Sequence, residues 1–246
     1  LIEAALDLGI RYFDTAPMYG MGTSEEVLGA VLKGIPDVVI ATKVGIARPP
    51  YSPLKAIMRR ASKVILDRSR QLRTAARRAY HSLRRRSERE IEASGIRHLT
   101  ASHVRQSLCE SCALLERSSV DVYLVHEPTP DDLASTELVK SMEDLVAEGL
   151  IGCFGAGISA CDAPSHLFGS VWQSAWPPPE SDQQRDASLR VYHGVLRGAA
   201  RDSGGRFLKP PPTLLREAME GQSESLILVA ASTPEKLREL VSDVTA

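Results

Sequence analysis

Short apolar segments that end in a titratable residue alternate with amphipathic helices along this chain. This alternation constrains the fold more than any other feature of the sequence. Residues 10–20 begin with a strand that ends at Asp14 and is followed by Tyr19, a second apolar run ends at Lys43, and a third ends at His126. Parallel strands connected by helices place their carboxyl ends at one edge, which is where (β/α) barrels build their sites. We therefore expect these four side chains to lie together.

The remaining segments repeat the same strand, loop and helix unit, which predicts an α/β fold with a parallel sheet. We expect a TIM (β/α)8 barrel that forms one domain over residues 1–246, with a basic loop insertion at about 46–100. The pattern gives seven strands, so we expect the first strand of the barrel, the one before Leu1, to be lacking. The expected strands lie near 10–14, 38–43, 120–126, 151–157, 171–173, 190–196 and 225–230, the expected helices over 1–9, 23–32, 101–117, 132–148 and 233–241, and the expected loops over 176–182 and 203–212.

The helix expected at 23–32 opens with acidic residues, Glu25 and Glu26, which suit the positive end of a helix dipole. Its apolar face is predicted to comprise Val27, Leu28, Val31 and Leu32.

The composition does not point to a particular class of binding partner. The net charge is −1 and 43% of residues are hydrophobic, which is ordinary for a globular protein and gives no overall argument for nucleic acid or membrane partners. No apolar run approaches the ~20 residues needed to cross a bilayer, and nothing resembles a signal peptide, so the expected location is cytoplasmic. The oligomeric state is left open.

The four cysteines, Cys109, Cys112, Cys153 and Cys161, are too few for a disulfide scaffold in a chain of 246 residues. Cys109 and Cys112 have the spacing of a redox motif, but they fall inside a helical pattern and lack a second pair that could complete a zinc site. We expect reduced cysteines on a helix and no metal centre.

Residues 55–89 differ from the rest because they are rich in Lys and Arg, including the run 84–86. Such a run can bind phosphate backbones by counterion release. Apolar residues are scattered through it and aromatic residues that could stack on bases are few, so a solvated insertion in the loop after Lys43 is favoured over nucleic acid binding. An insertion on that face could also cover a substrate.

The residues at the strand ends suit proton donation to a carbonyl group. Tyrosine has an ordinary pKa of ~10, which is too high for efficient acid catalysis near neutrality. An adjacent ammonium favours the phenolate, and a carboxylate keeps that ammonium charged and positioned. Tyr19, Lys43 and Asp14 supply these parts, and His126 can hydrogen-bond the carbonyl oxygen as negative charge develops there.

With these residues in place, the sequence resembles the aldo-keto reductase family over nearly its whole length. The resemblance is carried by Gly-Ile-Arg-Tyr-Phe-Asp-Thr-Ala-Pro-Met-Tyr-Gly at 9–20, Ser-Glu-Glu-Val-Leu-Gly at 24–29, Ala-Thr-Lys-Val-Gly at 41–45 and Val-Asp-Val-Tyr-Leu-Val-His-Glu-Pro at 120–128. It implies an NAD(P)H-dependent oxidoreductase that reduces aldehydes, ketones or sugar carbonyls, or oxidises the corresponding alcohols. It assigns the catalytic tetrad to Asp14, Tyr19, Lys43 and His126, with Tyr19 as the general acid.

The same resemblance implies NADPH as the cofactor, with NADH as the alternative. Ser159 and Gln173 correspond to residues that hold the nicotinamide carboxamide, although Ala160 replaces the family's asparagine. Ser232, Lys236 and Glu239 correspond to the segment that grips the adenosine phosphates and adenine, and Arg238 could serve in place of Lys236. The family also carries a C-terminal extension, which we expect this chain to lack. The absent strand and Ala160 motivate an alternative from another class, a catalytically weak subunit of the same fold that binds cofactor and acts in regulation or interaction.

Overall fold

The computed structural model describes residues 1–49, 99–158, 168–178, 187–202 and 205–242. Residues Leu1–Arg48 and Leu99–Ala246 form one compact unit, which is the unit described below. The basic stretch 55–89 and most of the expected insertion lie outside the described residues. Among the described helices, none is both long and apolar enough to cross a membrane.

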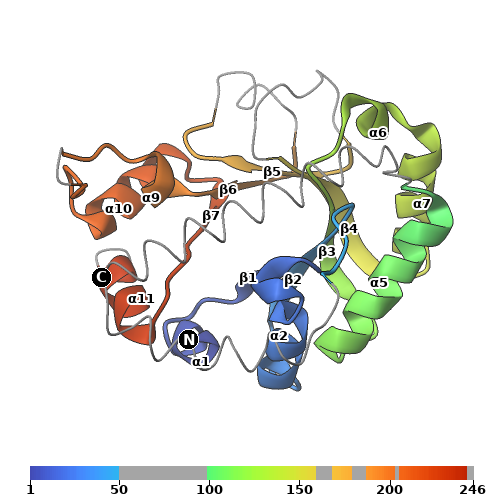
Figure 1. Cartoon of the computed structure of the whole chain (residues 1–246), viewed down its shortest axis with the longest axis horizontal. Coiled ribbons are helices and arrows are strands. Elements are labelled where there is room, and N and C mark those ends of the chain that lie inside the picture. Colours follow the sequence, from blue (N-terminus) through green and yellow to red (C-terminus); the bar gives the residue numbers. More distant parts are fainter. Residues whose placement is uncertain (50–98, 159–167, 179–186, 203–204, 243–246) are drawn as a thin grey trace. The chain divides into compact units, whose positions relative to one another are not determined.

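Seven strands form one sheet in sequence order, and every adjacent pair is parallel (Figure 1). This confirms the predicted architecture, seven parallel strands of a TIM barrel alternating with helices. Within the described residues, β1 and β7 are the two ends of this order and are not hydrogen-bonded to each other. The strands are β1 (Tyr12–Asp14), β2 (Val39–Val44), β3 (Val120–His126), β4 (Ile151–Gly157), β5 (Val171–Ala175), β6 (Leu189–His193) and β7 (Ser225–Leu228).

Side chains alternate along these strands between the barrel interior and the helix layer. One cluster fills the interior and includes Ala41, Val122, Leu124, Val171 and Val191. The intervening residues pack against the helices instead, as Tyr123, Val125 and Trp172 do. Because Asp14 and Lys43 share the parity of the interior residues, their side chains are directed inward at the strand ends.

The helices follow the expected alternation with the strands. The first and last of them meet, because Ala5 of the first helix shares an apolar cluster with Leu237 and Leu240 of the last (Figure 1). The helices are α1 (Ile2–Asp7), α2 (Ser24–Leu32), α5 (Ala101–Leu115), α6 (Pro130–Ala134), α7 (Thr136–Ala147), α9 (Val195–Gly198), α10 (Pro211–Gly221) and α11 (Pro234–Val241), with a 3-10 turn, η1 (Tyr19–Met21).

Several boundaries differ from the sequence prediction for identifiable reasons. The single helix expected at 132–148 is two helices, because Thr129 forms a capping box with Asp132 and Ser135 caps the next helix. The strand expected at 190–196 ends at His193, because Gly194 takes a left-handed φ of 79° and starts α9. Similarly, β7 ends at Leu228 rather than at residue 230.

Two helix assignments also change. The sequence did not predict α10, whose first position is occupied by a proline, Pro211, as is common at helix starts. On α2 the expected apolar face is wrong at Val27, which is 51% exposed. Glu25 is completely buried on that helix, and the reason lies in its polar partners, described below.

Candidate active site

A buried ion pair lies at the centre of the candidate site. The Lys43 Nζ donates to Asp14 Oδ1 at 2.6 Å and to the Thr15 carbonyl oxygen at 2.9 Å. The Lys43 side chain is only 2% exposed and that of Asp14 only 13%, so this pair is shielded from bulk water. A shielded charge acts strongly on its neighbours because little solvent screens it.

Two aromatic rings complete the group. Tyr19 lies on η1, directly after the β1 loop, and its ring centroid is 4.9 Å from Lys43 Nζ. The Tyr19 and His126 ring centroids are 5.7 Å apart, with an interplanar angle of 89°. His126 is the last residue of β3 and is buried. The structure therefore brings together all four side chains that the strand-end pattern singled out.

Burial and charge oppose each other at Lys43. Burial is the largest influence and lowers the pKa of its amine, while the Asp14 carboxylate raises it through charge and a hydrogen bond. Two more carboxylates, Glu25 and Glu127, also raise this pKa. The net result is a pKa of Lys43 below its ordinary value, and the carboxylates limit that decrease.

Gln173 is joined to the same carboxylate oxygen. Its Nε2 donates to Asp14 Oδ1 at 3.1 Å, while its Oε1 is buried without a hydrogen-bond partner among the described residues. A Cβ added at Gly157 would lie 3.0 Å from that Oε1 and 3.6 Å from Lys43 Cε, so any side chain at this position would crowd both groups. A buried acceptor without a partner fits an incoming N–H donor. Ser159, predicted to act with Gln173, lies outside the described residues.

His193 is a site residue that the sequence analysis missed. It ends β6 opposite Ala175, and the Ile158 backbone hydrogen-bonds its side chain. Burial is the largest influence on the pKa of His193 and lowers it. The charge of Asp14 raises this pKa, and the charge of Lys43 lowers it. The expected continuation of this strand to residue 196 concealed that His193 stands at a strand end, like the other site residues.

The predicted phosphate-binding residues lie at the start of α11. The Thr233 hydroxyl caps this helix by accepting from the Lys236 backbone N–H, and Lys236 Nζ donates to Ser232 Oγ at 3.3 Å. Ser232, Lys236 and Glu239 are all exposed. A capped helix start with a free surface and a nearby ammonium suits an anionic group.

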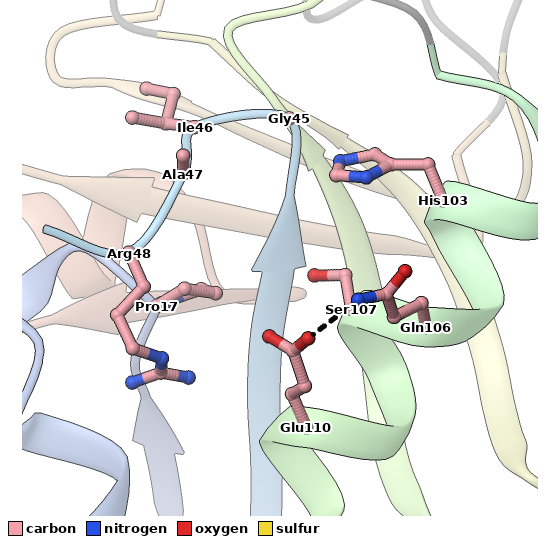
Figure 2. Close-up of a pocket in the computed structure, with 9 residues that line it drawn as sticks. All are labelled: Pro17, Gly45, Ile46, Ala47, Arg48, His103, Gln106, Ser107 and Glu110. Carbon is pink, nitrogen blue, oxygen red and sulfur yellow. Dashed lines mark hydrogen bonds between the residues drawn. The ribbon is translucent and has the colours of Figure 1, made fainter. Parts of the chain in front are cut away.

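A separate cavity of about 210 Å³ lies beside this site (Figure 2). None of the tetrad side chains lines it, although Pro17 and Gly45 belong to the loops that follow Asp14 and Lys43. The helix α5 forms one wall of this cavity, and most of the polar α5 side chains that line it are exposed. The lining residues are Pro17, Gly45, Ile46, Ala47, Arg48, His103, Gln106, Ser107 and Glu110.

The cysteines in the described part of the chain are free thiols, with Cys109 exposed, Cys112 buried and Cys153 partly buried. Burial raises the pKa of Cys112 to about 11, which makes that thiol a poor nucleophile. Cys161 lies outside the described residues. Where the chain is described, no group of three or more His, Cys, Asp or Glu side chains is arranged to hold a metal ion.

Comparison with known proteins decides the family. The model of the aldo/keto reductase family matches residues 1–167. The chain belongs to this family.

Among curated relatives of this aldo/keto reductase, D-threo-aldose 1-dehydrogenase of Pseudomonas sp is 32% identical over 167 residues, which cover 66% of the chain and 44% of the relative. The 6-dehydroglucose reductase of Novosphingobium aromaticivorans is 26% identical over 89% of the chain and 63% of the relative. The chain therefore spans about half to two thirds of the length of these relatives.

Solved structures agree on the fold of this aldo/keto reductase. The holo form of an aldo-keto reductase from Bacillus halodurans aligns with a TM-score of 0.59 at 20% identity, covering 100% of this chain and 80% of that chain. A glycerol dehydrogenase from Gluconobacter oxydans aligns with a TM-score of 0.61 at 18% identity, covering 99% and 77% of the two chains.

Proposed function

We propose that this aldo/keto reductase is an NAD(P)H-dependent oxidoreductase that reduces the carbonyl group of a small aldehyde, ketone or sugar, or oxidises the corresponding alcohol. The observation that carries the proposal is the buried Lys43–Asp14 pair, with Nζ 4.9 Å from the Tyr19 ring centroid. The printed names of two relatives, an aldose dehydrogenase and a dehydroglucose reductase, favour a sugar or sugar-like substrate.

In this proposal Tyr19 is the general acid. Its hydroxyl donates a proton to the substrate oxygen, and the adjacent Lys43 ammonium stabilises the phenolate that remains. Asp14 keeps the amine protonated and in place. His126, whose ring lies edge-on to that of Tyr19, hydrogen-bonds the substrate oxygen and orients it. In the direction of alcohol oxidation the same residues act in reverse.

The bound nicotinamide would supply or accept the hydride. We assign the buried Oε1 of Gln173, together with Ser159, to the nicotinamide carboxamide. Ser232 and Lys236 would hold the adenosine phosphates, and Glu239 the adenine. The ammonium of Lys236 favours NADPH over NADH, because only NADPH carries the additional 2′-phosphate.

The direct test replaces Tyr19 with phenylalanine, which removes the hydroxyl and keeps the ring. We expect turnover of an aldose and of an aromatic aldehyde to fall by about 10²- to 10⁴-fold, because general acid catalysis contributes that much. The affinity for NADPH, measured by fluorescence titration, should change less than threefold. Equal turnover by the variant and the parent would show that Tyr19 is not the proton donor.

The same assays of binding and turnover distinguish the proposed enzyme from the alternative, a cofactor-binding subunit. A parent protein that binds NADPH tightly but turns over no member of a broad carbonyl panel would be a cofactor-binding regulatory or interaction subunit. The buried Lys43–Asp14 pair favours the enzyme, since a binding subunit has no need to bury two such groups at that cost.

A further inference from the structure

A second buried carboxylate lies behind the tetrad, on the opposite side of β2. Glu25, on the first turn of α2, is 0% exposed. Its Oε1 accepts a hydrogen bond of 2.6 Å from the hydroxyl of Thr42, the residue before Lys43. A buried carboxylate is costly unless charge and hydrogen bonds compensate it, so its neighbours must account for its position.

Arg48 provides that compensation. Its Nη2 forms an ion pair with Glu25 Oε2, and its Nη1 donates to the Gly22 carbonyl oxygen at 2.9 Å. The Arg48 side chain is 23% exposed, so this ion pair is largely shielded from water. Figure 2 shows Arg48 on the loop after β2, where it also lines the cavity described above.

The three partners of this network come from the segments that carry the proposed acid and its lysine. Gly22 is the C-cap of η1, the turn on which Tyr19 lies. Thr42 and Arg48 flank Lys43 on β2 and the loop that follows it. A further hydrogen bond of 3.0 Å joins the Thr15 hydroxyl to Ser24 at the start of α2, and the Thr15 carbonyl oxygen accepts from Lys43.

We propose that Glu25 and Arg48 are positioning residues that hold the turn bearing Tyr19 against the strand end bearing Lys43. The pair acts from outside the tetrad and does not touch the substrate. Its charge also reaches the site, because the carboxylate of Glu25 raises the pKa of Lys43 against the effect of burial. The effect on turnover rests on the proposed function, whereas the effect on geometry does not.

The first test measures geometry without cofactor. In Glu25→Gln the ion pair is lost while the side chain keeps its size. We expect the NMR resonances of the Tyr19 ring and of the Lys43 amine to shift in this variant. Glu26→Gln is the matched control, because Glu26 is the next residue on the same helix turn but is exposed. Unchanged Tyr19 and Lys43 resonances in Glu25→Gln would overturn the proposal, whatever the protein catalyses.

The second test measures turnover. Misplacement of a reacting group by a fraction of an ångström to 1 Å can cost up to about 10²-fold in rate. We therefore expect Glu25→Gln to lower kcat by about ten- to a hundredfold, with KM and the NADPH dissociation constant changed less than threefold. Arg48→Lys, which keeps the charge, should restore most of the kcat lost in Arg48→Met. A Glu25→Gln variant with parental kcat would exclude a positioning role.

The double variant Glu25→Gln/Arg48→Met guards against simple unfolding, because it removes both charges and leaves neither buried alone. It should fold and still show the shifted resonances and the lowered kcat. Parental resonances in this folded double variant would overturn the proposal.

If the resonances shift but the parent reduces no carbonyl, the positioning network stands and the proposed function fails. If Tyr19→Phe abolishes turnover but the resonances stay in place, the function stands and the network fails.

Discussion

The strand ends of β1 to β3 and those of β5 to β7 contribute different kinds of groups to one site. The first region supplies Asp14, Lys43 and His126, which are held by a short ion pair and by ring contacts inside the barrel. The second region supplies Gln173 and His193, and beyond β7 come the exposed residues at the start of α11. The first region carries its charges as the shielded Lys43–Asp14 pair, whereas the second region contributes the amide of Gln173 and the imidazole of His193.

Under the proposed function, this difference separates the residues that move the proton from the residues that bind the cofactor. A group that moves a proton gains from low dielectric surroundings, because its partners then act on it strongly. A group that binds a large, charged cofactor must remain accessible and must give up few existing interactions. Substitutions in the first region should therefore affect turnover, and those in the second should affect binding.

Among the substitutions that compare the two regions, Lys43→Met should give the largest effect. In the proposed function it removes the charge that stabilises the Tyr19 phenolate, so we expect kcat to fall by about 10²- to 10³-fold, with the NADPH dissociation constant nearly unchanged. Lys33→Met is the control, because Lys33 forms an exposed ion pair with Glu116 elsewhere on the surface. Steady-state assays of both variants measure this effect. If Lys43→Met keeps more than a tenth of the parental kcat, the first region does not determine turnover as proposed.

Gln173→Leu should have an intermediate effect. It removes one buried acceptor and one donor, which is worth roughly 1–1.5 kcal/mol, or about tenfold in affinity. We expect weaker binding of NADPH and NADH alike, measured by fluorescence titration, with a smaller loss in kcat from the lost contact to Asp14. Gln106→Leu, on the exposed surface of α5, should leave binding unchanged. If Gln173→Leu lowers kcat by more than it weakens binding, Gln173 belongs with the first region.

Lys236→Ala tests the surface part of the second region. An exposed charge contributes little, so we expect NADPH affinity to fall about two- to fivefold and NADH affinity to stay constant. Raising the salt concentration should shrink the difference by screening. Arg238→Ala, on the same helix, distinguishes the two candidates: a larger loss there would transfer the role from Lys236 to Arg238.

His193→Gln should give the smallest effect, on the pH dependence of stability. Burial lowers the pKa of His193 below its ordinary value of 6.5. Just below that pH, this histidine is therefore protonated in the unfolded chain but not in the folded chain. The parent should therefore lose stability as the pH falls through 6.5, by less than about 1 kcal/mol since the group is partly exposed. Urea unfolding at pH 7.5 and 5.5 should show a flatter dependence in His193→Gln. His103→Gln, which removes an exposed histidine, should keep the parental slope.

The sequence predicted those features that depend on local patterns. Asp14, Lys43 and His126 were found because each ends an apolar run, and a parallel sheet necessarily brings such ends together. The position of Glu25 in the first turn of a helix is confirmed, but its burial was not predicted because such an acidic residue ordinarily faces solvent. Its partners, Thr42 and Arg48, lie 17 and 23 residues further along the chain, so no local pattern connects them. His193 was missed because only the turn at Gly194 reveals where its strand ends.

A single oxygen atom, Asp14 Oδ1, receives both the amine of Lys43 and the amide of Gln173. A ligand that turned the Gln173 side chain toward itself would take that donor away from the carboxylate. Lys43 would then share this oxygen with one donor fewer. Under the proposed function, binding at Gln173 would in this way alter the Lys43–Asp14 pair beside the proton donor.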